Sequence, residues 1–207
     1  MTLLEMLLSL DITDFTKARL RRFLAGVCQE GQGTFLLGRL LEALPKGTLE
    51  AHLERGHAEI PAFFAYSPYL GGLLLKETRM LADPDAYARF RKSPFDPVLF
   101  EQDLMQALNQ EGMDRQARLK VLRHSKDKAF LKIAILDYNR SIGLERTMLF
   151  LSRLAEVLLD AALELSRKDL APRIGYPRKK NGDGLGEEIA FCVMGLGKLG
   201  ARELNYH

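Results

Sequence analysis

The sequence predicts a mainly helical body followed by the first strand and glycine turn of an α/β unit. From Met1 to about Leu170, apolar residues recur mainly at spacings of three and four, and β-branched runs are scarce. This periodicity is typical of successive amphipathic helices. Residues 188–194, EIAFCVM, form a nearly continuous apolar run next to a glycine. A short run of this kind is typical of a buried strand.

The composition between these two parts indicates where one domain ends. Residues 171–187 are rich in Gly, Pro and charged residues and show no helical period, which is typical of a linker or an exposed loop. We therefore expect a helical domain over residues 1–170, a linker or loop over residues 171–187, and the start of a second domain over residues 188–207.

Within the helical part, start and stop signals predict individual elements. Ser67 followed by Pro68 predicts a helix that begins there, because serine caps free amides and proline lacks the amide that would be left unbonded. Residues 145–170 predict the longest helix, which we expect to be largely buried among its neighbours. Gly- and Pro-containing breaks are expected at residues 30–34, 44–48, 57–64, 82–86, 92–97 and 109–113.

Composition and charge narrow the class of protein. Hydrophobic residues make up 47% and charged residues 28% of the 207 positions, as in ordinary folded soluble proteins. The formal charge of +3 is small for this length, so we expect neither nucleic acid nor membrane as a partner. No run reaches the roughly 18 apolar residues of a membrane span.

The cysteines and the amino-terminal segment indicate a cytoplasmic protein. Cys28 lies in an expected helix and Cys192 in the expected strand, so both are predicted to be small buried hydrophobic residues in a reducing compartment. The first apolar run has no basic segment before it and is interrupted by Glu5, which argues against a secretory signal.

The most specific motif is Gly195-x-Gly197-x-x-Gly200, which directly follows the expected strand. A dinucleotide-binding fingerprint would need a βαβ unit and an acidic residue about 20 positions later, and the chain contains neither. The alternative is a turn whose free amides approach a phosphate while Lys198 neutralises its charge, which suits nucleotidyl transfer. On the residues alone, Lys198 fits a solvated helix start equally well.

The stretch MGLGKLGARELNY at residues 194–206 resembles the motif of the glutamine synthetase adenylyltransferase family, the bifunctional adenylylating and adenylyl-removing enzymes. In that family G-x-G-K-L-G-[GA]-x-E-L leads within a few residues into S-D-x-D-L. Residues 67–75, 122–138 and 151–164 are similar to helical segments that precede the motif. His207 stands where the family usually has Ser.

The resemblance implies a truncated polymerase-β-type nucleotidyltransferase domain that begins near residue 188. It assigns nucleotide and phosphate binding to Gly195, Gly197, Lys198 and Gly200. The paired carboxylates that hold Mg²⁺ would lie beyond His207, so the chain contains no catalytic or metal-binding residue of its own. We therefore expect Mg²⁺ and an adenine nucleotide in the full-length parent, no cofactor in the fragment, and no activity of the fragment alone.

The resemblance also implies a reaction and partners. One half of the family's enzymes adds AMP to a tyrosine of glutamine synthetase, and the other removes it by phosphorolysis to ADP. Residues 203–205, ELN, and the position of the motif favour the removing half. The adenylylating half and a helical module that only binds proteins remain alternatives. Expected partners are glutamine synthetase and the PII signal protein.

Two further patterns have ordinary explanations. Residues 114–132 contain seven basic and two acidic side chains, which form either a solvated helix face or a surface for an acidic partner. His52 and His57 are five positions apart, whereas a helical metal pair needs a spacing of four. We predict no metal site there.

Overall fold

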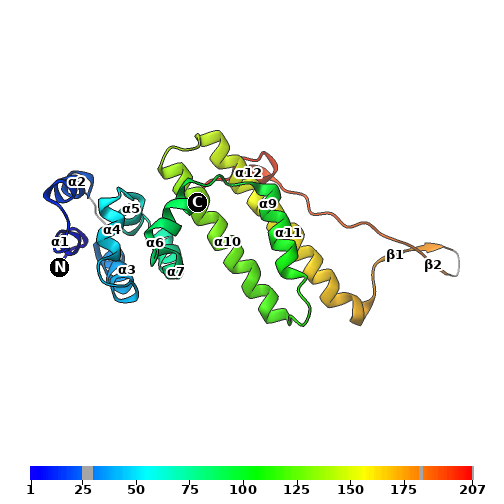
Figure 1. Ribbon diagram of the computed structural model, residues 1–207. Coiled ribbons are helices and arrows are strands. Elements are labelled where there is room, and N and C mark those ends of the chain that lie inside the picture. Colours follow the sequence, from blue (N-terminus) through cyan, green and yellow to red (C-terminus); the bar gives the residue numbers. More distant parts are fainter. Residues whose placement is uncertain (25–29, 182–183, 207) are drawn as a thin grey trace. The chain divides into compact units, whose positions relative to one another are not determined.

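The structure is a computed structural model that describes residues 1–24, 30–181 and 184–206. Most of the described chain is helical, and the only described strands form a two-stranded antiparallel sheet (Figure 1). The mainly helical fold class is thus confirmed. The chain forms two compact units, one of residues 1–94 and 131–141, the other of residues 95–130 and 142–207.

Among the described residues, the first unit contains eight short helices and the last part of a long one. The short helices are α1 (Leu3–Leu8), α2 (Asp14–Leu24), α3 (Glu30–Ala43), α4 (Thr48–Glu54), α5 (Glu59–Tyr66), α6 (Pro68–Lys76), α7 (Thr78–Leu81) and α8 (Pro84–Lys92). The long helix is α10 (Arg115–Tyr138).

Two glycines allow α3, α5 and α6 to pack closely around Phe64, which is fully buried. A Cβ atom at Gly33 of α3 would lie 2.0 Å from the carbonyl oxygen of Phe64, and one at Gly71 of α6 would lie 2.8 Å from the Phe64 ring. Any larger side chain would therefore separate these helices. This contact explains why α3 contains glycine where the sequence suggested a break.

The helix starts follow the capping residues. The side chain of Ser67 accepts a hydrogen bond from the amide of Leu70, and Pro68 is the first residue of α6. The predicted helix start at residue 67 is therefore confirmed. The break at 30–34 is wrong, because these residues belong to α3. The break predicted at 57–64 is confirmed only at residues 57–58, between α4 and α5, because α5 begins at Glu59.

A polar cluster is buried in the first unit. Glu59 is fully buried, and its Oε1 accepts hydrogen bonds from the hydroxyl of Tyr87 at 3.0 Å and from Nε of Arg91 at 2.7 Å. Arg91 also donates to the side-chain oxygen of Asn139. Within the described chain, Glu59 Oε2 has no hydrogen-bond partner. The Glu59 carboxylate thus joins α5 to α8, and Arg91 extends the cluster to Asn139, the residue that follows α10.

Beside it, His52 and His57 form a hydrogen-bonded pair. Nε2 of His52 lies 2.8 Å from the carbonyl oxygen of Leu81, and the two Nδ1 atoms are 2.8 Å apart. Since a carbonyl only accepts, His52 carries its proton on Nε2, and His57 donates from Nδ1. Burial, followed by the nearby charges of His52 and Arg91, lowers the pKa of His57 to about 4. Both rings are therefore neutral at pH 7.

The second unit consists of α9 (Pro97–Leu108), the first part of α10, α11 (Leu144–Ile174), β1 (Arg178–Asn181), β2 (Gly184–Glu188) and α12 (Gly197–Gly200). Its core joins α9 to α11 through Leu104, Leu108, Val157 and Ala161. The aspartate before α9, Asp96, caps this helix by accepting from the amides of Val98 and Leu99.

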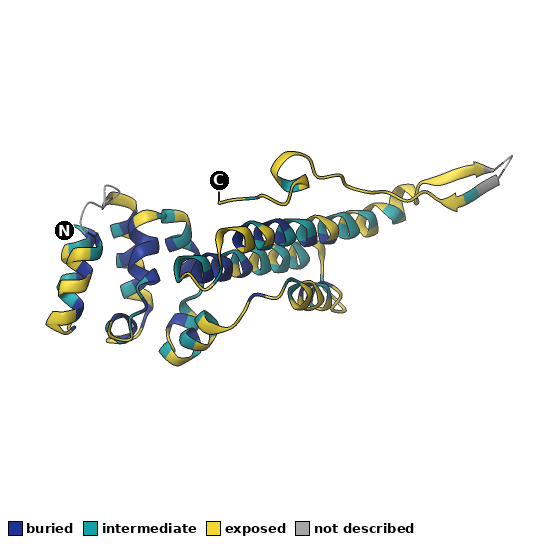
Figure 2. Ribbon diagram, turned by 90° about the horizontal axis from the view of Figure 1, so that it is seen from above, coloured by how far each residue is buried: buried dark blue, intermediate teal, exposed yellow. Residues whose placement is uncertain are grey.

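The helix α11 is the longest described helix, with 31 residues, as predicted. The expectation that it would be largely buried is wrong (Figure 2). Leu151, Leu154 and Val157 on one face are buried, whereas Leu149 and Leu159 are each 40% exposed. Too few described elements pack on α11 to cover its other faces.

The predicted strand at 188–194 is also not formed. The segment 189–196 has no regular structure, and the described strands lie instead at 178–181 and 184–188, almost entirely within the expected linker (Figure 1). Phe191 is 60% exposed, and Cys192 is exposed rather than buried. Cys28 lies outside the described residues. An apolar strand needs hydrogen-bonded neighbours and side chains on both faces, and no described segment supplies them.

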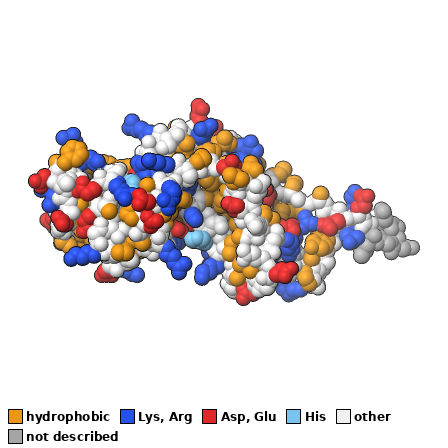
Figure 3. Space-filling model, in the orientation of Figure 1, with side chains coloured by type: hydrophobic (Ala, Val, Ile, Leu, Met, Phe, Trp, Pro, Cys, Tyr) orange, Lys and Arg blue, Asp and Glu red, His pale blue; other side chains and the backbone are white. Residues whose placement is uncertain are grey.

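The surface shows no dominant charge on the face seen in Figure 3, where basic and acidic side chains are interspersed. None of the helices in the described ranges combines the length and apolar composition that a transmembrane span requires.

The buried ion pair predicts a large loss of stability when one partner is removed. Glu59→Ala leaves Arg91 and the Tyr87 hydroxyl without their common acceptor, and the free energy of unfolding should fall by roughly 3 kcal/mol. Arg89→Ala is the matched control on α8, because its ion pair with Asp83 is solvent-exposed and contributes at most about 1 kcal/mol. Urea titration measures the free energy of unfolding of both variants. Equal losses in Glu59→Ala and Arg89→Ala would contradict the larger contribution of the buried ion pair.

The histidine pair predicts acid sensitivity. The pKa of His57 is about 4 in the folded protein, against 6.5 for an ordinary histidine, so the unfolded chain binds more protons between these values. Stability should therefore be greatest above pH 6.5 and fall by roughly 1–2 kcal/mol between pH 7 and pH 5. His57→Gln should flatten this slope in urea titrations, and His124→Gln on the exposed surface is the control. An unchanged slope in His57→Gln would exclude the pair as its source.

Candidate functional site

The glycine motif forms a tight turn that contains the four-residue helix α12. Gly197 has φ +58, which favours glycine. A Cβ atom at Gly200 would lie 2.4 Å from the carbonyl oxygen of Gly195, so this position has no room for a side chain. The amide of Glu203 donates to the carbonyl of Lys198 at 2.7 Å and closes the turn.

The structure places the four predicted site residues, Gly195, Gly197, Lys198 and Gly200, within this turn, and their exposure differs. Gly195 and Gly200 face each other and line a pocket, whereas Gly197 has open space where its Cβ would be. Lys198 is exposed, and no ion pair involves it within the described chain. Gly197 and Lys198 are thus both exposed to solvent.

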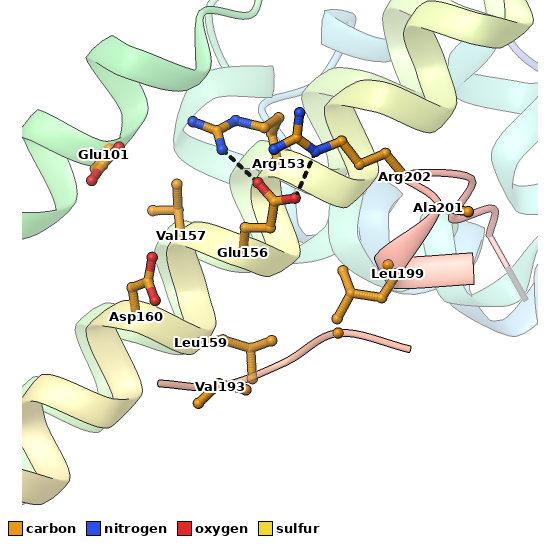
Figure 4. Close-up of a pocket in the computed structure, with 12 residues that line it drawn as sticks. Glu101, Arg153, Glu156, Val157, Leu159, Asp160, Val193, Leu199, Ala201 and Arg202 are labelled. Atoms are coloured by element: carbon orange, nitrogen blue, oxygen red, sulfur yellow. Dashed lines mark hydrogen bonds and ion pairs between the residues drawn. The ribbon is translucent and has the colours of Figure 1, made fainter. Parts of the chain in front are cut away.

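The pocket lies between the turn and α11 and has a volume of about 640 Å³ (Figure 4). Most of its lining is charged or small. Glu101 of α9 and Asp160 of α11 contribute carboxylates, and Arg153 and Arg202 contribute guanidinium groups. The apolar side chains of Val193 and Leu199 complete one side.

Glu156 joins the two arginines. Its Oε2 accepts from Nη1 of Arg153 at 2.5 Å, and its Oε1 accepts from Nε of Arg202 at 3.0 Å (Figure 4). Burial raises the pKa of Glu156, but the hydrogen bonds from Arg153 and Arg202 outweigh it and lower the pKa overall. The carboxylate therefore stays ionised at neutral pH. It binds Arg153 of its own helix and Arg202, which follows the turn.

The segment after the turn makes two more contacts with the helices. The amide of Leu204 donates to the hydroxyl oxygen of Ser152 at 3.2 Å, and Ser152 is fully buried. The ring of Tyr206 packs edge-on against Phe130, with ring centroids 5.5 Å apart. Sequence reasoning did not single out Ser152, Glu156 or Arg202. The sequence does contain one signal, a stripe of polar residues along α11 at spacings of three and four, namely Arg153, Glu156, Asp160, Glu164 and Arg167.

The last residue of the basic run at 114–132, Lys132, belongs to the first unit. Lys132 is buried, and its Nζ donates to the carbonyl of Phe90 and to the hydroxyl of Ser93. Burial lowers the pKa of Lys132 to about 8. It therefore belongs to the interior of the first unit and not to a basic surface.

No metal site is present among the described residues, since no three His, Cys, Asp or Glu side chains in those ranges come close enough together to hold an ion. The arrangement can contribute amides, one ammonium group and a rigid support, which suits phosphate binding more than acid–base chemistry.

A sequence model of glutamate-ammonia ligase adenylyltransferase matches residues 58–207. The chain belongs to the glutamate-ammonia ligase adenylyltransferase family. This match includes the glycine turn and α11, so the pocket described above lies within the family's part of the chain. The predicted resemblance is confirmed.

Relatives with curated descriptions share the same name, bifunctional glutamine synthetase adenylyltransferase/adenylyl-removing enzyme. The protein of Nitrosococcus oceani is 38% identical over 46% of this chain, and that of Brucella suis is 30% identical over 71%. The matched regions cover only 10% and 14% of those two proteins. No solved structure matches the chain significantly.

The close approach within the turn predicts that Gly200 is structurally required. Gly200→Ala places a methyl group against the Gly195 carbonyl, so the turn must open and the amides of Glu203 and Leu204 should exchange with solvent more than about tenfold faster. Gly72→Ala on α6 is the control, because a Cβ there meets nothing within 4 Å. Hydrogen exchange detects both, and unchanged exchange in Gly200→Ala would refute the packing.

Proposed function

We propose that the full-length protein removes AMP from the modified tyrosine of glutamine synthetase by phosphorolysis, which yields ADP. The observation that carries this proposal is the family match over residues 58–207. The matched region includes the exposed Gly-x-Gly-Lys turn at residues 195–198. Residues 203–205, ELN, favour the removing half over the adenylylating half. Such an enzyme would work in the cytoplasm, with the PII signal protein as a further partner.

In this proposal, the turn holds the phosphates of the nucleotide. Backbone amides at Gly195, Gly197 and Gly200 approach the phosphate oxygens, and Lys198 supplies a positive charge. The open space at Gly197 and the exposure of Lys198 support this role. The contacts of Arg202 and Leu204 with α11 keep the turn from moving when the phosphate binds.

The described residues fit only the phosphate part of such a site. They offer no carboxylate group suited to a metal, and the family's paired carboxylates would lie beyond residue 207. Mg²⁺ in the full-length protein would stabilise negative charge on the transferred phosphoryl group. We propose that the 207-residue chain alone has no nucleotidyl-transfer activity for this reason.

The exposed segment 189–196 fits the same proposal. Phe191 and Val193 on one face and Met194 on the other are apolar and 49% to 81% exposed. A strand that is apolar on both faces belongs in the interior of a sheet. We propose that residues 188–207 begin a polymerase-β-type domain and that residues 188–194 form a strand there.

Two alternatives differ in what the chain does. The turn could belong to the adenylylating half, or the helices could act only as a protein-binding module. The exposed leucines of α11, such as Leu149 and Leu159, favour some contact with other parts of the full-length protein but do not distinguish these functions. The following experiment does.

Lys198→Ala in the full-length protein should lower AMP removal from adenylylated glutamine synthetase at least about tenfold, because a charge-assisted phosphate contact is lost. ADP release in the presence of Mg²⁺ and inorganic phosphate measures this activity. AMP addition from ATP to unmodified glutamine synthetase is measured in parallel. The control is Lys180→Ala in the hairpin, which is exposed and outside the turn.

Loss of AMP removal alone supports the proposal. Loss of AMP addition alone assigns the turn to the adenylylating half. If both activities persist in Lys198→Ala, the phosphate-binding role is excluded and the binding-module alternative is favoured.

A further inference from the structure

The glycine turn is held in place by Glu156, a side chain 46 positions before its partner Arg202. Glu156 of α11 accepts a hydrogen bond from Arg202, the second residue after α12, at a distance of 3.0 Å. The same carboxylate accepts from Arg153, which lies one turn earlier on the same helix. The two arginines therefore share the Glu156 carboxylate, but Arg153 belongs to α11 itself and Arg202 to the segment that follows α12.

Arg202 has a backbone conformation that few residues adopt. Its φ is +59, in the left-handed region, which side chains with a Cβ normally avoid. Its amide donates to the carbonyl of Leu199 at 3.1 Å, and its side chain is 56% exposed at the ion pair. Such a conformation persists where surrounding contacts hold it. The ion pair with Glu156 is one of those contacts.

The next residues continue this attachment. Leu204 donates its amide to Ser152, one turn before Glu156 on α11. The Ser152 hydroxyl in turn donates to the carbonyl of Met148 at 2.8 Å. Its orientation is therefore set by α11, and the serine oxygen is presented as an acceptor. Two successive turns of α11 thus bind the chain on either side of Glu203.

Glu203 connects the segment bound to α11 with the glycine turn. Its amide donates to the carbonyl oxygen of Lys198 at 2.7 Å. The contacts run without interruption from Glu156 and Ser152 through residues 202–204 to Lys198. The peptide that carries the lysine ammonium is consequently fixed relative to α11 and not only relative to its own loop.

We propose that Glu156 is a positioning residue, which through Arg202 holds the glycine turn on α11 and sets the place of Lys198 and the turn amides at the nucleotide phosphates. This inference rests on the proposed function. A group that contacts a reacting phosphoryl acts efficiently only in a narrow range of positions. Loosening the turn should therefore slow the reaction without affecting recognition of glutamine synthetase.

The test uses single variants of the full-length protein and one matched control. Glu156→Gln removes the negative charge of the acceptor and Arg202→Gln removes the guanidinium donor, so each variant eliminates the ion pair that holds the turn. Arg153→Gln breaks the other hydrogen bond of the same carboxylate, which lies within α11. Arg202→Lys retains a positive charge that can reach Glu156. The measurements are steady-state AMP removal, with kcat and separate KM values for inorganic phosphate and adenylylated glutamine synthetase, and the thermal midpoint.

Glu156→Gln and Arg202→Gln should each lower kcat/KM for phosphate about fivefold or more, with the KM for glutamine synthetase and the thermal midpoint unchanged. Arg153→Gln should stay within about twofold of the unchanged protein, and Arg202→Lys should recover most of the loss. The double variant of Glu156 and Arg202 should lose no more than either single variant, because both break one contact.

Unaltered kcat/KM in Arg202→Gln, an equal loss in Arg153→Gln, or additive losses in the double variant would overturn the positioning role. These results are distinguishable from failure of the proposed function. If the proposed function is wrong, the protein without any substitution releases no ADP.

Discussion

The ion pair between Glu156 and Arg202 is the contact on which the arrangement of the glycine turn depends. Beside this ion pair, the amide of Leu204 donates to Ser152 and the ring of Tyr206 packs against Phe130. An exposed ion pair contributes little to global stability, so its importance is geometric. It selects one orientation of a short loop that has few apolar contacts of its own. The 31-residue helix α11 thereby supports the short turn.

The first unit differs in that its polar contacts are buried. Glu59 of α5 is bonded to Tyr87 and Arg91 of α8, and Arg91 also reaches Asn139 after α10. The paired histidines beside this cluster stay neutral. Buried polar groups of this kind favour one packing of the helices over others, because any slip leaves a donor or acceptor without its partner. The cost is sensitivity to acid and to removal of a single partner.

Local signals in the sequence predicted the helix starts at Ser67 and the extent of α11 well, because capping and periodicity act within a few residues. The glycines of α3 were misread, since Gly33 reflects contact with Phe64 in another helix. The strand at 188–194 failed because a strand requires neighbours that the described chain lacks. The spacing of the glycines predicted a tight turn at residues 195–200, and their binding of phosphate stays a prediction. Glu156 was missed because its partner, Arg202, is far away in sequence.

The central claim is that the turn of residues 195–200 holds a nucleotide phosphate. A crystal structure of the full-length protein with Mg²⁺ and ADP tests it most directly. The account predicts a phosphate oxygen within about 3.2 Å of a backbone amide of the turn and of the Lys198 ammonium, with Arg202 still bonded to Glu156. Phosphates bound elsewhere, with the turn amides facing solvent, would contradict it.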